Sequence, residues 1–459
     1  MSLRSKLYTI WLKNRPKNLS AAKVIVVVFA AIILLGTGLL ALPAASRSGS
    51  SCGFRPALFT ATSATCVTGL SLFDTWTQWS GFGQIVIISL IQVGGLGFMS
   101  AATLVVFLLR RRIGLKQRLV MAQALSVSDM DGIVSLQKTV LVGSFSIEAI
   151  GALILTLRFW GQYGFLTALK WGVFHSVSAF CNAGFDIFGC ITPGVSLMEF
   201  QNDPVVLLTL GMLVVVGGLG FLVWQEIAEH RRFRKYSVYT RLVLLTTLGL
   251  IVGGWILICI LEWNNPGTLG NLSVPGKLLN GLFLSMTLRT AGFSSIDQAQ
   301  LTQSGKAFSM ILMLIGGSSG STAGGLKTVS FIVLVLFLIS RARGRESVCV
   351  FKRTIPQSQV MDAMTIAMIM LCLAFLGGIF ISATSPVDFT DALYEAVSAL
   401  ATVGLTAGVT SALSIPAQYL IIMYMFFGRV GVLTISLGFL AGNRAEERFR
   451  YAQTSLLIG

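Results

Sequence analysis

Long apolar runs alternate with short polar or mixed segments along the whole chain. Several of the runs reach the ~20 residues that an α-helix needs to cross about 30 Å of hydrocarbon. The runs are continuous rather than alternating, which indicates membrane-spanning helices and not barrel strands. The eight predicted spans cover 24–44, 83–109, 136–157, 204–224, 241–261, 307–340, 361–384 and 417–441.

A shorter segment lies between the two spans of each successive pair and ends in a glycine motif. It is too short and too polar to span, so we expect a half-helix that returns as extended backbone, which is tolerated only beside a cavity or inside protein. The four half-helices cover 55–65, 167–180, 276–288 and 389–401, and their glycines are 115, 108 and 112 residues apart. Ser63, Ser178 and Ser398 stand six residues before their glycines, whereas the third copy has Met286 there, with Ser285 beside it.

These four units predict an all-α polytopic membrane protein with four helix–half-helix–helix (M1–P-loop–M2) repeats around one central pore. The carbonyl end of a half-helix carries partial negative charge, which favours a cation at the pore centre. The predicted domains are a cytoplasmic N-terminus 1–23, repeats at 24–135, 136–239, 240–360 and 361–445, and a C-terminal tail 446–459.

The four glycine motifs have only their glycine in common. Side-chain ligands would not explain this diversity, whereas backbone carbonyls would, because glycine permits the backbone that points them inward. Rings of carbonyls suit dehydrated alkali cations, above all potassium, although the residues alone leave potassium against sodium open. The predicted selectivity filter consists of Val67, Thr68, Gly69, Asn182, Ala183, Gly184, Thr290, Ala291, Gly292, Thr402, Val403 and Gly404.

A second glycine-rich motif lies beyond each filter glycine. Residues 93–98 and 216–221 are identical, and small residues there permit either helix packing or close approach of the pore wall. The third copy lies in the span 307–340, whose 34 residues would be about 51 Å long as one helix. Its glycine density predicts a broken helix and a loop at membrane depth, which needs a water-filled cavity.

We interpret this loop as a gate below the filter. It is not a phosphate-binding loop, because Leu326 separates Gly325 from Lys327 and no strand precedes it. The gate residues are Gly316, Gly317, Ser318, Ser319, Gly320, Ser321, Thr322, Ala323, Gly324, Gly325, Lys327 and Arg429.

Arg429 stands where the other three units have Gly95, Gly218 and Gly317. An arginine inside an apolar helix is expensive and indicates a functional site. We expect it to point into the permeation path, where it repels cations or pairs with carbonyls of the gate. The alternative is a salt bridge between helices, with Glu148 as its partner.

The charge pattern indicates orientation rather than a nucleic-acid partner. The net charge is +16, and 25 of the 34 Lys and Arg fall at the two termini and in 110–138, 231–241 and 341–353. These segments share one side, which the positive-inside rule makes cytoplasmic, together with both termini. Nine of 18 acidic residues fall on the other side or in its re-entrant segments, as an attractive outer mouth or as solvated loop charges. They are Asp74, Asp186, Glu199, Asp203, Glu262, Asp297, Asp388, Asp391 and Glu395.

The composition, 54% hydrophobic and 11% charged, excludes a soluble domain. The seven Cys show no spacing typical of disulfide frameworks or zinc sites. The spans hold no cluster of His, Cys or carboxylates that would suggest an enzyme. We interpret His175 and His230 as structural and expect Arg289, beside the third filter glycine, to brace its half-helix from behind.

With the four glycine turns, the Gly/Ser-rich interruption and Arg429, the chain resembles the Trk/Ktr/HKT superfamily of cation transporters over essentially its whole length. The absence of an extra N-terminal hairpin makes it most similar to the B-type membrane component of the Ktr system. The resemblance implies potassium uptake at the cell membrane, often sodium-stimulated, with K⁺ as the transported ion and Na⁺ as a second candidate. It also implies a homodimer on a cytoplasmic ring of nucleotide-binding (RCK/KTN-type) subunits, with the nucleotide on that partner.

The same resemblance implies that Gly69, Gly184, Gly292 and Gly404 are the filter glycines. Sodium-selective plant relatives commonly have Ser at the first position, so Gly69 goes with potassium. The runner-up is a sodium-permeable or sodium/potassium co-transporting member. A secondary transporter with a midplane site would show inverted repeats, whereas these four units run in the same orientation.

Overall fold

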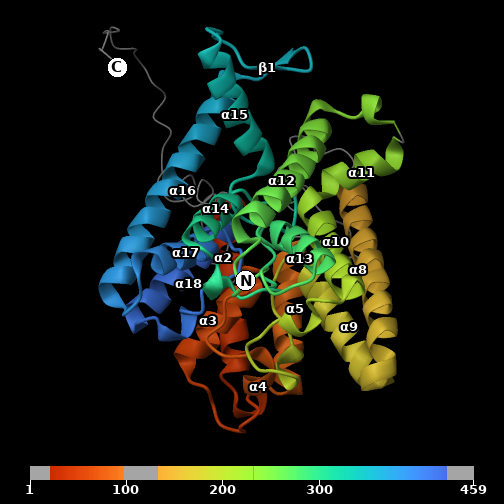
Figure 1. Cartoon of the computed structure of the whole chain (residues 1–459), viewed down its shortest axis with the longest axis vertical. Coiled ribbons are helices and arrows are strands. Elements are labelled where there is room, and N and C mark those ends of the chain that lie inside the picture. The colour runs from red at the N-terminus through yellow and green to blue at the C-terminus, as the bar shows by residue number, and fades with distance from the viewer. Residues whose placement is uncertain (1–20, 98–132, 231, 432–459) are drawn as a thin grey trace, which may run out of the picture.

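The structure is a computed structural model that describes residues 21–97, 133–230 and 232–431 of the 459-residue chain. The N-terminal segment up to residue 20, most of the basic segment 110–138 and the C-terminal tail therefore lie outside the described residues. Helices dominate the described part (Figure 1).

Four long apolar helices are the first helices of the predicted pairs. All four are long and apolar enough to cross a membrane, because each holds at least 18 residues of high mean hydropathy. They confirm the spans predicted at 24–44, 136–157, 241–261 and 361–384. They are α2 (Ala21–Leu40), α8 (Ile133–Tyr163), α12 (Val238–Glu262) and α16 (Gln357–Thr384).

A shorter helix follows each long one and packs against it. The observed bounds lie within two residues of those predicted for the half-helices, at both ends. Gly53 and Gly164 precede two of them with φ of 86° and 77°, a conformation that glycine adopts without steric cost. The half-helices are α3 (Phe54–Thr65), α9 (Phe165–Phe180), α13 (Val274–Thr287) and α17 (Phe389–Leu400).

In the first, second and fourth pairs the second helix ends earlier than predicted, at Leu96, Leu219 and Val430. The second helices of the four pairs are α5 (Gly81–Leu96), α10 (Pro204–Leu219), α14 (Gln303–Leu314) and α18 (Ile415–Val430). The expected continuous span 204–224 is wrong, because the chain bends by 92° after α10 and continues as α11 (Phe221–Glu229). Residues 98–109 and 432–441 of two further expected spans lie outside the described residues.

Three of the second helices end at matched glycines, Gly97, Gly220 and Gly431. Their φ values are 82°, 92° and 92°, and a residue at positive φ ends an α-helix. The sequence pattern indicated only small packing residues at this motif and did not predict these helix ends. The third copy behaves as predicted, since α14 ends at Leu314 and α15 (Thr328–Ala342) begins after a loop, 315–327.

The remaining elements lie at the two ends of the molecule. A hairpin of two short antiparallel strands, β1 (Cys349–Val350) and β2 (Arg353–Thr354), follows α15 and corrects the all-helical expectation locally. It lies at the same end as α11, whereas the short helix α4 (Thr75–Gln78) lies at the other (Figure 1). The 3₁₀ turns are Pro43–Ala45, Phe188–Cys190, Met198–Phe200, Phe233–Lys235, Gln298–Gln300 and Thr410–Ala412.

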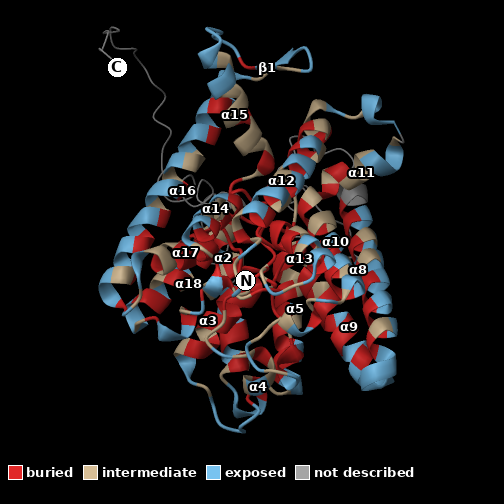
Figure 2. Ribbon diagram, viewed as in Figure 1, coloured by how far each residue is buried: buried red, intermediate tan, exposed pale blue. Residues whose placement is uncertain are grey.

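Burial separates the centre of the molecule from its periphery. Buried residues gather where the half-helices and their loops meet, and exposed residues cover the outer faces of α8 and α16 (Figure 2). Those outer faces include large apolar side chains such as Leu153, 60% exposed, and Met368, 65% exposed. A lipid-facing surface explains this exposure, since a bilayer solvates apolar side chains.

Candidate functional site

Each half-helix ends in a similar turn. A non-glycine residue with positive φ directly follows the C-cap residue in three of the turns, whereas Arg289 separates the two in the third. The predicted filter glycine lies two positions after the positive-φ residue in all four turns. The positive-φ residues are Val67, Asn182, Thr290 and Thr402, with φ of 56°, 60°, 66° and 53°. Such a conformation costs about 1–2 kcal/mol per residue, and it persists where the surrounding structure determines it.

The four filter glycines form a closed ring, which we call the glycine ring. A Cβ atom on any of them would meet the carbonyl oxygen of the residue before the next glycine in the ring. The distances are 2.6 Å from Gly69 to Ala183, 2.8 Å from Gly184 to Ala291, 2.8 Å from Gly292 to Val403 and 2.0 Å from Gly404 to Thr68. Only glycine lets four backbones approach so closely, so the structure brings all four predicted filter segments together.

Hydroxyl groups of the half-helices hold the turns from behind. Ser63 and Ser398 each accept a hydrogen bond, of 3.1 Å, from the backbone N–H of their own filter glycine. Ser178 instead donates to the carbonyl of Phe185 at 2.7 Å. In the third turn the group is Thr287, which donates to Phe293 at 2.7 Å.

The serine noted beside Met286 has another partner. The Ser285 hydroxyl donates at 2.7 Å to the carbonyl of Ile251 in α12, away from the turn. Sequence spacing therefore identified three of the four hydroxyls. The fourth was missed because Thr287 lies one residue closer to the turn than Met286, at a position where the other copies carry no comparable contact.

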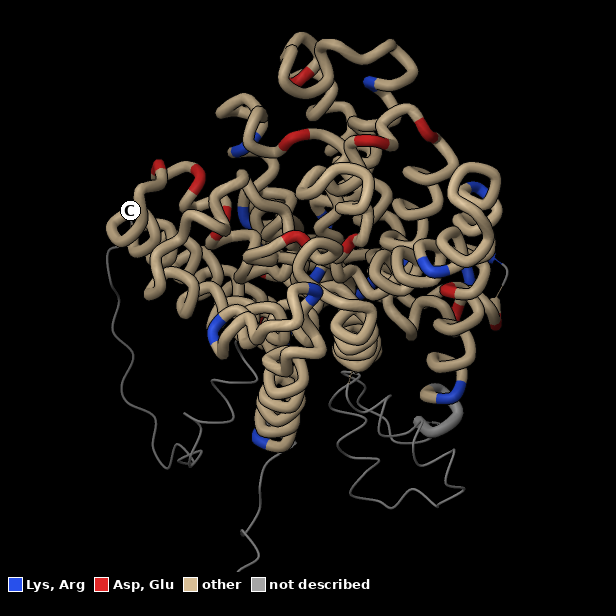
Figure 3. Tube along the Cα trace, turned by 90° about the horizontal axis from the view of Figure 1, so that it is seen from below, with Lys and Arg blue, Asp and Glu red and all other residues tan. Residues whose placement is uncertain are grey.

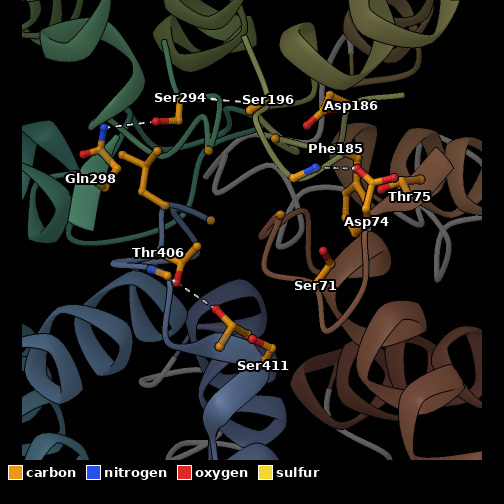
Figure 4. Close-up of a pocket in the computed structure, with 18 of the residues that line it drawn as sticks. Ser71, Asp74, Thr75, Phe185, Asp186, Ser196, Ser294, Gln298, Thr406 and Ser411 are labelled. Atoms are coloured by element: carbon orange, nitrogen blue, oxygen red, sulfur yellow. Dashed lines mark hydrogen bonds between the residues drawn. The ribbon is translucent and has the colours of Figure 1, made fainter. Parts of the chain in front are cut away.

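A polar cavity of about 320 Å³ lies against one side of the glycine ring (Figure 4). All four ring glycines line it, together with Asp74, Asp186 and Asp297, and we call it the outer vestibule. The remaining polar lining comes from all four units: Ser71, Thr75, Ser196, Ser294, Gln298, Thr406, Thr410 and Ser411.

Two vestibule carboxylates lie close enough to influence each other. Burial, and then the Asp74 carboxylate, raise the pKa of Asp186 from 3.8 to about 6. Asp74 caps α4 by accepting from the N–H of Thr77 at 2.8 Å, and it also accepts from Gly194 at 3.2 Å. Asp186 accepts from the N–H of Phe188 at 3.2 Å. The vestibule therefore changes charge near pH 6.

Other acidic residues of the predicted outer mouth have structural partners. Figure 3, seen from the end that carries α4, shows acidic positions spread among its loops. Glu262 is fully buried and accepts from Asn265, Thr268 and Thr302 at 2.7–3.0 Å. Asp203 pairs with Arg158 at 2.8 Å, and Asp391 pairs with Lys306 at 2.7 Å. These carboxylates bind neighbouring segments together, a structural role that neither interpretation of the sequence expected.

The loop 315–327, which we call the α14–α15 loop, contributes no residue to the lining of the vestibule and contacts the ends of half-helices. Its Thr322 hydroxyl donates to the carbonyl of Phe180 and to the Asn182 side chain, both at 3.1 Å. A Cβ on Gly324 would lie 2.0 Å from the Thr402 hydroxyl. The loop thus contacts the second and fourth turns directly.

Arg429 joins this loop to the first unit. Its guanidinium donates to the carbonyls of Thr322, Gly94 and Gly95, the last at 2.9 Å. It therefore pairs with a carbonyl of the loop, one of the two contacts expected for it. Glu148 accepts instead from the Gln92 amide at 3.0 and 3.1 Å, and no ion pair joins it to Arg429 in the described part of the chain.

Arg289 and Lys327, two further charged groups near the ring, bond to backbone carbonyls of the third unit. Arg289 is 6% exposed, and its guanidinium lies 3.5 Å from the Thr247 hydroxyl and 3.4 Å from the carbonyl of Gly316. This placement behind the third turn matches the expected brace. Lys327 donates to the carbonyl of Ala323 at 2.8 Å, within its own loop.

His175 is a structural residue, as predicted. Its Nε2 accepts from the N–H of Ile187 at 3.2 Å, so Nδ1 carries the proton and donates to the carbonyl of Trp171 at 2.7 Å. The ring also stacks on Phe188 with centroids 3.9 Å apart. Among the described residues no three His, Cys, Asp or Glu side chains form a group that could hold a metal ion.

The fold and this site define a class: a multi-pass helical membrane transport protein whose half-helices end in a shared backbone ring. The family model described as "Cation transport protein", TrkH, matches residues 5–447. The chain belongs to this TrkH cation transport family, and its members are transporters and not enzymes.

Relatives in the family are similar over their whole length. The potassium/sodium uptake protein NtpJ of Enterococcus hirae is 38% identical over 98% of this chain and 100% of its own. The Ktr system potassium uptake protein B of Bacillus subtilis is 38% identical over the full length of both chains. The crystal structure of the potassium transporter TrkH from Vibrio parahaemolyticus shares the fold, with a TM-score of 0.72 at 18% identity, and covers 93% of this chain and 86% of its own. These matches confirm the predicted Trk/Ktr relationship.

Proposed function

We propose that the protein takes up potassium across the cell membrane through the glycine ring, which acts as a carbonyl-lined selectivity filter. The observation that carries this proposal is the closure of the ring. Four backbone segments approach so closely that each glycine lies against the carbonyl of a neighbouring segment. Preorganised carbonyls can replace the hydration shell of an alkali cation without reorganisation.

The names of the relatives support potassium as the ion. One is called a potassium uptake protein and another a potassium/sodium uptake protein. The second name favours the alternative function, a sodium-permeable or sodium/potassium co-transporting protein. Gly69 supports potassium over this alternative, because the resemblance associates glycine at this position with potassium and serine with sodium-selective relatives.

We also propose that the α14–α15 loop is the gate of this pore. The loop contacts two turns of the ring, and Arg429 holds it to the first unit. These contacts support a division into four repeats in which residues of the third and fourth repeats control passage through the pore. The end that carries α11 and the β-hairpin is basic, which supports a cytoplasmic position for it and for both termini.

The proposal includes partners. The name of the Bacillus relative, potassium uptake protein B of a Ktr system, supports a protein that works with a second component. A homodimer seated on a cytoplasmic ring of nucleotide-binding RCK/KTN-type subunits is the arrangement we expect. The nucleotide belongs to that partner and not to this chain.

Purified protein in proteoliposomes tests the function. Uptake of rubidium, as a potassium tracer, and of sodium is measured with and without external sodium. Rubidium uptake that potassium competes with, well above sodium uptake, supports the proposal. Comparable sodium uptake favours the alternative, and the exclusion of both ions by vesicles holding folded protein contradicts both. Empty vesicles are the control.

A further inference from the structure

The α14–α15 loop is bound to the break between α10 and α11. Ending α10 at Gly220 leaves carbonyls of its last turn without partners inside the helix. The loop provides the missing donors: the N–H of Thr322 bonds Gly217 at 3.3 Å, and the N–H of Ser318 bonds Gly218 at 3.0 Å. The Ser318 hydroxyl donates to Leu219.

The contacts also run in the other direction. The first N–H of α11, from Phe221, donates to the carbonyl of Gly320 at 2.9 Å. The hydroxyl of Tyr239, in the first turn of α12, donates to the carbonyl of Ser319 at 3.0 Å. Both acceptors lie at the turn of the loop, so two broken segments satisfy each other's backbone at membrane depth, where free polar groups are costly.

Of the matched glycines Gly97 and Gly220, only Gly220 lies against the α14–α15 loop. Gly97 and Gly220 end their helices with nearly the same backbone, at φ of 82° and 92° and ψ of 145° and 144°. A Cβ on Gly220 would lie 2.4 Å from the Ser318 hydroxyl and 2.9 Å from the carbonyl of Ser319. A Cβ on Gly97 would meet no described atom within 4 Å.

The same region connects to the basic end of the molecule. α11 leads through the turn Phe233–Lys235 into α12, and the Glu226 carboxylate accepts from the Ser237 hydroxyl at 2.8 Å and from its N–H. This bond closes the corner between the two helices. The segment that holds the loop is therefore a short, internally tied unit that reaches the protein's surface.

We infer that the gate has two halves, the α14–α15 loop and the α10–α11 break, and that Gly220 and Tyr239 are positioning residues that hold the loop beneath the ring. Displacement of the α11–α12 corner removes the contacts at Ser319 and Gly320 together. A movement at the cytoplasmic end is therefore transmitted to the pore through the α11–α12 corner. This inference rests on the proposed role of the loop as the gate.

Two substitutions with matched controls test it, each in the full-length protein in proteoliposomes. Gly220→Ala forces the loop away, whereas Gly97→Ala imposes the same backbone strain without contacting it. Tyr239→Phe removes one hydrogen bond, and Tyr236→Phe makes the same chemical change at a tyrosine whose ring contacts Phe233. Basal rubidium uptake should rise about fivefold in Tyr239→Phe, the effect of one typical hydrogen bond on a closed state, and further in Gly220→Ala.

The rubidium-to-sodium ratio is the second readout. It should stay at the wild-type value while uptake rises, because the ring itself is intact; general damage to the protein would lower uptake or the ratio. Wild-type uptake in Tyr239→Phe, or equal effects of Gly220→Ala and Gly97→Ala, overturns the inference. If Gly220→Ala does not fold, Tyr239→Phe decides.

A third variant separates the inference from the proposed gate. Arg429→Ala releases the loop from the first unit without touching the α10–α11 break. If it raises uptake while Tyr239→Phe does not, the loop is a gate but is not held by the break. If neither variant raises uptake, the proposed gate fails as well.

Discussion

The spacing of the glycine ring predicts a graded response to added methyl groups. Alanine at any ring glycine must adopt a left-handed backbone, at about 1–2 kcal/mol. The steric cost differs between positions, because the new Cβ would lie 2.0 Å from a carbonyl oxygen at Gly404, 2.6 Å at Gly69 and 2.8 Å at Gly184 and Gly292. Gly404→Ala should therefore be the most damaging of the four substitutions.

The magnitude follows from the displacement needed. Real Cβ atoms essentially never approach another heavy atom within 3.0 Å, so at Gly404 the Thr68 carbonyl must retreat by about 1 Å. A misplacement of about 1 Å in a preorganised site can cost about 100-fold. We expect a loss of about that size in the preference for rubidium over sodium, and a loss of about tenfold or less at Gly292.

Competitive uptake of rubidium and sodium in proteoliposomes measures this preference. Gly164→Ala is the matched control, because Gly164 has φ of 77° and its Cβ would meet no described atom within 4 Å. It shares the backbone strain but lies at the start of a half-helix, far from the ring in sequence. Equal preferences in Gly404→Ala, Gly292→Ala and Gly164→Ala would refute the reasoning that carbonyl positions select the ion.

Three further predictions concern charged groups. Arg429→Ala removes charge-assisted hydrogen bonds worth about 1.5–3 kcal/mol each and should raise cation flux at least tenfold in proteoliposomes; unchanged flux would contradict its role in control. Because the pKa of Asp186 is raised to about 6, external acid that crosses this pH protonates it, and the KM for potassium should rise. The raised pKa of Asp186 also stabilises the folded protein at pH values below 3.8, the ordinary pKa of the group. This stabilisation is lost as the pH rises through about 6. Asp186→Asn should flatten the pH profile of KM. A wild-type profile in this variant would exclude Asp186 as the group whose titration changes KM. Lys306→Met leaves the partly exposed Asp391 carboxylate without its 2.7 Å partner and should destabilise the protein by about 1.5 kcal/mol. Thermal unfolding in detergent measures this loss, which Asp391→Asn in the same protein should partly reverse; an unchanged midpoint would show that the pair does not contribute.

Much of the helical framework could be predicted from consecutive residues. The length and continuity of apolar runs placed the four long helices, and their interruption by polar segments placed the half-helices within two residues. The density of glycine in 316–325 predicted the break between α14 and α15. Each of these properties depends on local composition, because helix length and helix propensity are set by neighbours along the chain.

The role of an individual glycine could not be predicted in the same way. Gly220 and Gly97 occupy identical sequence motifs, and both end helices where continuous spans were expected. Only Gly220 lies against the α14–α15 loop. The difference comes from a segment about one hundred residues away, and no local pattern contains it.

The sequence by itself determined a polytopic helical membrane protein with four glycine turns and a broken helix in the third unit. The tertiary structure decided that the turns close into one ring and that Thr287 holds the third turn. It further decided that Arg429 donates to the α14–α15 loop, whereas Glu148 accepts from Gln92. It also decided that the loop is anchored in the α10–α11 break. The physical reason is that apolar length and glycine content act locally, whereas the approach of one backbone to another is fixed only when distant segments pack.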